Sequence, residues 1–158
     1  MTDFEQRLLQ RDIKPTAVRI LTLRALEEAQ CALSLTDLEA RMLTVDKSSI
    51  FRSLTLFLSH HLVHAVDDGT GQTKYAICPS DCHCGETIHE HLRDLHPHFF
   101  CENCRRTFCL RHSSIPLVDL PEGFHLHSAA YVLKGLCPEC RKKIHCEEEG
   151  EEQLPQEK

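Results

Sequence analysis

Two pairs of cysteines, each with a two-residue gap, carry the most specific chemistry in this sequence. The pairs are Cys101 with Cys104 and Cys137 with Cys140. A two-residue gap lets both thiolates of a pair point at one ion, and two such pairs complete the tetrahedral sulfur site that suits zinc. Because four thiolates leave no open position for a substrate, the spacing predicts a structural Zn(II) site. The competing interpretation, a redox dithiol, needs only one such pair.

A second group of metal-binding side chains lies directly before Cys101. His96 and His98 alternate along a predicted strand, so both imidazoles face the same side, and Cys109 follows in the next predicted strand. We treat these three residues as a candidate sensor site that lacks one ligand, with a set of solvated histidines as the alternative. The missing ligand is sought among Cys31, Cys78, Cys82, His83, Cys84, His89 and His91. His60 and His61 are expected to cap a helix, and His125 and His127 to lie on a strand surface.

The composition limits the class of protein. The chain has 158 residues with 10 Cys and 12 His, and no apolar run is long enough to span a membrane. Its first residues are polar and charged, so we expect no signal peptide. We therefore expect a cytoplasmic protein whose cysteines bind metal, since disulfides are disfavoured in a reducing compartment.

The distribution of charge bears on DNA binding. The net charge is −6, which is unusual for a DNA-binding protein. Through Ile77, however, 9 Lys and Arg oppose 10 Asp and Glu, whereas the remaining chain has 9 against 14. A nearly neutral N-terminal half can bind DNA if its basic residues share one face.

The first 77 residues predict three or four helices followed by a hairpin. Apolar residues at helical spacing indicate the helices. Good N-cap residues mark the starts of three of them: Thr16, Ser34 and Asp46. Two short apolar strands, Leu62–Val66 and Lys74–Ile77, flank a turn rich in Asp and Gly. This is the order of a winged helix-turn-helix, which places one helix in the major groove. The alternative is a helical bundle with a hairpin that does not bind DNA.

The fourth helix has a buried stripe and a polar face. The apolar positions are Ile50, Leu54, Phe57 and Leu58, and the opposite face carries Lys47, Ser48, Ser49, Arg52 and Thr55. Short polar and basic side chains on one face suit a helix that contacts DNA.

The predicted fold class is α+β. We expect a winged helix-turn-helix DNA-binding domain at 1–77 and a Cys/His-rich hinge or linker at 78–95. A small α/β dimerisation domain with the four-cysteine zinc site follows at 96–146, with strands at Phe99–Phe100, Thr107–Leu110 and His127–Leu136. The acidic residues 147–158 are expected to be a disordered tail.

These features together resemble the ferric uptake regulator family, which includes iron, zinc and peroxide sensors. The similarity extends from about Leu8 to Cys140. The matching stretches are Lys14–Arg19, Val45–Val63, His96-x-His98-x-x-Cys101-x-x-Cys104 and Cys137-x-x-Cys140. The last two form the more specific motif. The resemblance implies a winged-helix domain, a hinge and an α/β dimerisation domain.

The resemblance also implies roles for individual residues. Ser49, Phe51 and Arg52 correspond to positions of the family's recognition helix, beside Ser48, and Arg19 corresponds to a phosphate contact, with Lys14 nearby. The four cysteines correspond to the structural zinc site, and His96 and His98 to two ligands of the regulatory site.

The sequence departs from the family at three other regulatory positions. The hinge histidine is replaced by Ala32 next to Cys31, the wing glutamate by Ala76, and a further glutamate ligand by Cys109. Leu95 and Pro97 replace ligands of the family's additional site. The shift toward sulfur favours Zn(II), and it leaves Zn(II) or Fe(II) as the second, regulatory metal.

The function predicted from the sequence is a homodimeric, metal-dependent repressor that binds double-stranded operator DNA and has no catalytic residues. One alternative is a zinc enzyme, but the H-x-E motif of zinc deaminases is missing upstream of the cysteine pairs, and Leu136 rather than proline precedes Cys137. The other alternative is a zinc-stabilised protein-interaction module that does not bind DNA.

Overall fold

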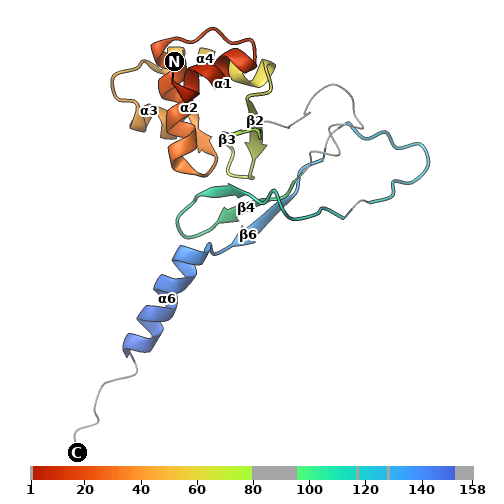
Figure 1. The fold of residues 1–158 in the computed structure, drawn as a ribbon. Helices are drawn as coiled ribbons and strands as arrows, with labels where there is room; N and C mark the ends of the chain where they lie inside the picture. Colours follow the sequence, from red (N-terminus) through yellow and green to blue (C-terminus); the bar gives the residue numbers. More distant parts are fainter. Residues whose placement is uncertain (1, 80–95, 117, 128, 152–158) are drawn as a thin grey trace, which may run out of the picture.

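The computed structural model describes residues 2–79, 96–116, 118–127 and 129–151 (Figure 1). The helices are α1 Asp3–Gln10, α2 Ala17–Ala29, α3 Leu35–Arg41, α4 Lys47–Ser59 and α6 Pro138–Glu151. The strands are β1 Leu33–Ser34, β2 Val63–Asp67, β3 Thr73–Ile77, β4 His98–Cys101, β5 Thr107–Cys109 and β6 Val132–Gly135. Five proposed linker ligands lie outside the described residues: Cys82, His83, Cys84, His89 and His91.

Three helices begin where their capping residues predict. The hydroxyl of Thr16 accepts a hydrogen bond from the backbone N–H of Arg19, and the carboxylate of Asp46 accepts one from Ser49. Ser34 forms a reciprocal capping box with Asp37 at the start of α3. These bonds satisfy N–H groups that have no partner inside the helix, so the local sequence sets each start.

Helix α4 supplies the centre of the N-terminal core. Ile50, Leu54 and Phe57 are fully buried, as the apolar spacing predicted, whereas Leu58 is half-buried. They pack in one cluster with buried residues of the other helices and of the hairpin, among them Leu8, Leu23, Leu38 and Val63. This packing holds α4 with its polar face outward.

The predicted hairpin is present and forms the wing. Strands β2 and β3 are antiparallel, with β1 on the outer side of β3. In the connecting turn, Gly69 and Gly71 have φ values of 79° and 81°, a conformation that favours glycine. The N-terminal part is therefore a winged helix-turn-helix.

The C-terminal part is a second small sheet followed by a helix. In the order β5-β4-β6, β4 pairs antiparallel with β5 and parallel with β6. The expected strand over His127–Leu136 is shorter, at Val132–Gly135, because its partner β4 spans only His98–Cys101. In Figure 1 the second sheet lies beside the β2–β3 hairpin and α6 extends away from it.

The prediction for the acidic tail is partly wrong. Helix α6 continues through residues 147–151, which we expected to be disordered, and residues 152–158 lie outside the described part of the chain. The helix begins at Pro138, a position in the first turn that proline favours, and glutamate and lysine sustain helices well. An acidic composition by itself did not indicate where the helix ends.

We predict that Leu54→Ala lowers the free energy of unfolding by about 3 kcal/mol, because the truncation removes buried apolar surface and leaves a cavity. Urea denaturation of the zinc-loaded protein, followed by far-UV circular dichroism, measures the change. Thr55→Ala, on the exposed side of the same turn, serves as the control and should change stability by less than about 0.5 kcal/mol. Equal effects of the two substitutions would contradict the assigned orientation of α4.

Candidate metal centres and DNA-contact surface

The four paired cysteines converge as a tetrahedral metal site requires. One ligand atom from each of Cys101, Cys104, Cys137 and Cys140 lies within 4.8 Å of every other. Zn–S bonds of about 2.3 Å in a tetrahedron place sulfur atoms about 3.8 Å apart. The Sγ atoms of Cys104 and Cys137 are 3.8 Å apart, and three of the four residues are buried. The residues present therefore fit a closed zinc site.

Local hydrogen bonds favour the thiolate form of Cys101 and Cys104. The backbone N–H of Cys137 donates to Sγ of Cys101 over 3.3 Å. Burial by itself would raise the pKa of Cys101, but backbone N–H donors, led by that of Cys137, lower the pKa to about 6. The Arg106 guanidinium donates to Sγ of Cys104 over 3.4 Å and lowers the pKa of that thiol against the opposing effect of burial. Thiolates are the form that binds zinc.

A second cluster combines three imidazoles and one thiol. His64, His96, His98 and Cys109 each offer one ligand atom, and these atoms lie within 4.8 Å of one another. Nε2 of His64 is 3.4 Å from Nε2 of His98 and 3.6 Å from Sγ of Cys109. Tetrahedral zinc with ordinary bond lengths separates two nitrogens by about 3.4 Å and a nitrogen and a sulfur by about 3.6 Å. This set also fits Zn(II).

Strands from both parts of the chain position these four side chains. His64 is on β2 of the wing, whereas His98 and Cys109 are directly paired between β4 and β5, and His96 lies two residues before His98. The other ring nitrogen of His64, Nδ1, lies 3.5 Å from Sγ of Cys78 at the end of the wing. A partner on the second nitrogen orients an imidazole toward a metal.

Burial sets the protonation states in this second cluster. Burial, reinforced by the neighbouring histidines, lowers the pKa of His64 to about 3, and it lowers the pKa of His98 to about 4. Both imidazoles are therefore neutral at pH 7, as metal binding requires. Burial also raises the pKa of Cys109 to about 11, so coordination of that thiol would release a proton.

The structure brings together His96, His98 and Cys109, and it adds His64, which the sequence analysis missed. His64 is directly opposite Ala76 in the antiparallel register. Ala76 is the position where the resemblance indicated a lost wing ligand, so the side chain across the hairpin stands in its place. Identifying the residue opposite Ala76 in the predicted hairpin would have pointed to His64.

Two of the other proposed ligands line a neighbouring cavity. Cys31 and Cys78 border a space of about 540 Å³ between the two parts of the chain, together with Cys109 and Arg111. Neither belongs to the group of four, and burial raises the pKa of the Cys31 thiol. The cavity leaves Cys109 accessible from one side of the cluster.

The predicted DNA-contact residues of α4 lie near its N-terminal end. Ser48 and Arg52 are exposed, Phe51 is 50% exposed, and Ser49 is half-buried. The Arg52 guanidinium donates to the hydroxyl of Ser49 over 3.2 Å. Three polar side chains and one aromatic ring are therefore available to solvent at this end of α4.

The start of α2 meets this surface. A hollow of about 310 Å³ is lined by Thr16, Val18, Arg19, Ser49, Arg52 and Ser53. The structure thus places Arg19 and Arg52 at the same hollow, although they come from different helices. Lys14 is exposed outside the lining, and its carbonyl accepts a hydrogen bond of 2.6 Å from Arg19.

Comparison with solved structures identifies the fold. A zinc uptake regulator in complex with zinc and DNA superposes with a TM-score of 0.59 at 19% identity, covering 92% of this chain and 100% of that one. The chain has the fold of the ferric uptake regulators. The regulator of Vibrio cholerae gives 0.56 at 16% identity over 85% and 100% of the two chains. That of Pseudomonas aeruginosa with manganese gives 0.54 at 20% over 87% and 99%. The sequence matches no protein-family model and no curated protein.

The described residues contain no helix that is both long and apolar enough to cross a membrane.

We predict that the zinc-saturated protein holds two zinc ions per chain, one for each cluster. Cys140→Ser should lose the ion at the cysteine site and destabilise the second sheet, since α6 and β4 meet there. Inductively coupled plasma mass spectrometry after desalting measures the content. Cys31→Ser, outside both clusters, is the control and should keep both ions. Loss of one ion from the control would make Cys31 a ligand.

Proposed function

We propose that this chain is a dimeric transcriptional repressor of metal homeostasis that binds operator DNA when a regulatory zinc site is loaded. The observation that carries the proposal is the group of His64, His96, His98 and Cys109, whose ligand atoms come from both the wing and the second sheet at tetrahedral spacing. The four-cysteine site would hold a structural Zn(II).

The donor set supports Zn(II) over Fe(II) at the regulatory site. Three neutral imidazoles and one thiolate are borderline-soft ligands, which zinc accepts in a tetrahedral arrangement. A carboxylate-rich set would suit iron or manganese better. The thiol of Cys109 is therefore the ligand that most favours Zn(II) over Fe(II) at this site.

The chain connects the regulatory site directly to the proposed recognition helix. Helix α4 ends at Ser59 and β2, which carries His64, begins at Val63. When bound, the metal supplies a bond between His64 and the second sheet. Fixing β2 in this way also fixes α4, so the population of chains with α4 correctly oriented would rise with occupancy.

A basic surface at the start of α4 supports DNA binding. Arg52 and Arg19 share one hollow, and Ser48, Ser49 and Phe51 extend the surface along the helix. Two guanidiniums at one hollow suit a phosphate or a base edge. Lys14, next to Arg19, would add a further phosphate contact.

The outer edge of the second sheet supports dimerisation with another copy of the chain. Among the described residues, β6 pairs only with β4. Leu133 and Leu136 are 45% and 41% exposed, and Phe124 is 70% exposed. An open strand edge with exposed apolar side chains is a surface that a second copy would cover.

We predict that Arg52→Ala weakens binding to the protein's own promoter by at least about tenfold. The slope of the logarithm of affinity against the logarithm of salt concentration should also fall by about one. Fluorescence anisotropy in zinc-saturated buffer at several salt concentrations measures both quantities. Arg24→Ala serves as the control, because that guanidinium lies over the ring of Phe4 away from the hollow. Equal losses in both variants would indicate non-specific charge effects.

We predict that His64→Ala abolishes the response of DNA binding to added zinc, because the wing then has no ligand in the cluster. The same anisotropy titration with Zn(II), Fe(II) and Mn(II) against a chelator measures the response. His60→Ala, at the end of α4 and outside the cluster, should respond as the wild type does. If zinc-loaded wild type binds no DNA, the protein-interaction module becomes the better interpretation.

A further inference from the structure

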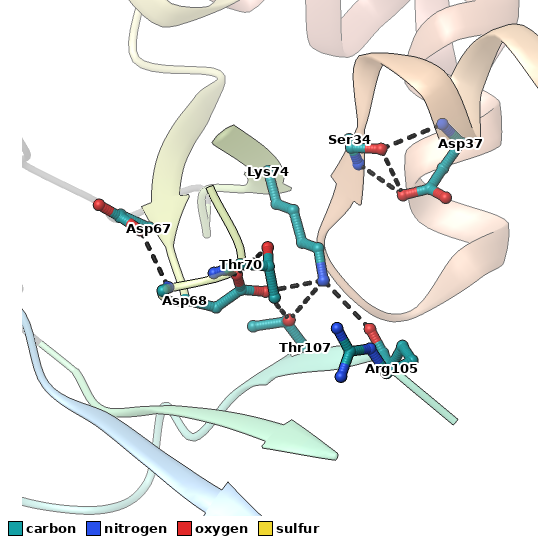
Figure 2. A network of polar contacts seen from close by, with 9 residues as sticks. Ser34, Asp37, Asp67, Asp68, Thr70, Lys74, Arg105 and Thr107 are labelled. Carbon is teal, nitrogen blue, oxygen red and sulfur yellow. Dashed lines mark hydrogen bonds and ion pairs between the residues drawn. The ribbon is translucent and has the colours of Figure 1, made fainter. Parts of the chain in front are cut away.

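A buried network of charged and polar groups joins the wing to the second sheet (Figure 2). Asp68 and Lys74, at the two ends of the wing turn, form an ion pair of 2.7 Å, and their side chains are only 0% and 8% exposed. The hydroxyl of Thr107, the first residue of β5, donates to the Asp68 carboxylate over 2.5 Å and accepts from Nζ of Lys74 over 2.9 Å. Nζ also donates to the carbonyl of Arg105 over 3.1 Å.

Three contacts of this network depend on the register of the wing against β5: Thr107 with Asp68, Thr107 with Lys74, and Lys74 with the carbonyl of Arg105. Although burial opposes it, the Lys74 ammonium, with the hydroxyls of Thr107 and Thr70, holds the pKa of Asp68 well below its usual range. The carboxylate is therefore charged. Sliding the wing along β5 would leave it with Lys74 and Thr70, which belong to the wing, but would remove the hydrogen bond from Thr107. Loss of a hydrogen-bond partner is costly for a buried charged group. The network therefore favours one position of the wing against β5.

The network and the regulatory site lie on the same two elements. Thr107 and Cys109 are alternate residues of β5 and face the same side, and His64 and Lys74 share one face of the hairpin through the pairs His64↔Ala76 and Val66↔Lys74. Between them, Ala32, Val66 and Ala76 form a buried apolar cluster that Cys109 contacts. The polar network, the apolar cluster and the metal ligands therefore follow one another across one interface.

We propose that Thr107 and the Asp68–Lys74 pair form a positioning latch that holds the wing against β5 before metal binds. The inference rests on the proposed regulatory site. The latch keeps His64 within ligand distance of His96, His98 and Cys109, so it sets the metal affinity of the site without contacting the ion. Coordination of His64 would add a second connection between the wing and the second sheet.

Thr107→Val tests the latch, because it keeps the volume and removes the hydroxyl. Thr70→Val is a matched control: its hydroxyl also donates to Asp68, over 2.5 Å, but within the wing turn. Thr107→Ser restores the hydroxyl and should rescue the wild-type behaviour. Zinc affinity of the regulatory site is measured by competition with a chromophoric chelator in protein whose cysteine site stays loaded. We expect about a tenfold weaker affinity for Thr107→Val and changes within about twofold for the other two.

A second measurement examines the interface without regulatory metal. The buried backbone N–H of Ala32 donates to the carbonyl of Thr107 over 2.8 Å, so its hydrogen exchange reports separation of the two sheets. The N–H of Cys78, bonded to Leu62 within the wing domain, is the internal reference. Thr107→Val should accelerate exchange at Ala32 about tenfold and leave Cys78 unchanged, whereas Thr70→Val should change neither.

The two measurements separate the latch from the proposed function. If the wild-type protein binds only one zinc ion, the regulatory site is refuted. Hydrogen exchange at Ala32 then tests the latch by itself. Wild-type zinc affinity and Ala32 exchange in Thr107→Val would overturn the latch. If Thr107→Val does not fold, the Asp68→Ala/Lys74→Met double variant removes every side-chain partner of that hydroxyl without leaving an unpaired charge. Unchanged Ala32 exchange in the double variant would overturn the latch equally.

Discussion

The packing of the wing hairpin against strand β5 is the contact on which the other features of this protein depend. It brings His64 to three ligands that the chain supplies much later, and it buries the Asp68–Lys74 pair against Thr107. The backbone joins the same contact, because Ala32 donates to the carbonyl of Thr107 next to β1. Without this contact, the second cluster would consist of three candidate ligands, and no residue of the wing would belong to it.

The two clusters of candidate metal ligands differ in their donor groups and in how the protein affects the protonation of those groups. At the cysteine site, N–H donors and the Arg106 guanidinium lower the pKa values of Cys101 and Cys104, whereas burial and the neighbouring cysteines raise the pKa of Cys140 to about 11. At the second site, the imidazoles are neutral and Cys109 holds its proton. Binding there competes with that proton, which lowers affinity at neutral pH. Four cysteines that close the coordination shell suit a structural ion.

Local chemistry explains why much of the fold was predictable from the sequence. Thr16, Ser34 and Asp46 cap their helices through bonds to residues three positions later, and the apolar stripe of α4 follows from helical periodicity alone. The hairpin follows from two short apolar strands around a glycine-containing turn. Within each cysteine pair, a two-residue gap aims both thiols at one point, whereas the two pairs meet because β4 and β6 are parallel neighbours. Except for the meeting of the two cysteine pairs, each of these features depends on residues close together in the chain.

Features that depend on register between distant strands came only from the tertiary structure. His64 became a candidate ligand because β2 pairs with β3 so that His64 is opposite Ala76, and because this face packs on β5. Thr107 and Lys74 looked ordinary in the sequence, since their interaction joins residues 33 positions apart. The length of β6 was set by its partner β4. The sequence by itself determined the four N-terminal helices, the wing hairpin and the geometry within each cysteine pair, because short-range bonds define them. Tertiary structure decided the convergence of the two cysteine pairs, the fourth candidate ligand and the position of the wing, because only packing between distant segments brings those side chains together.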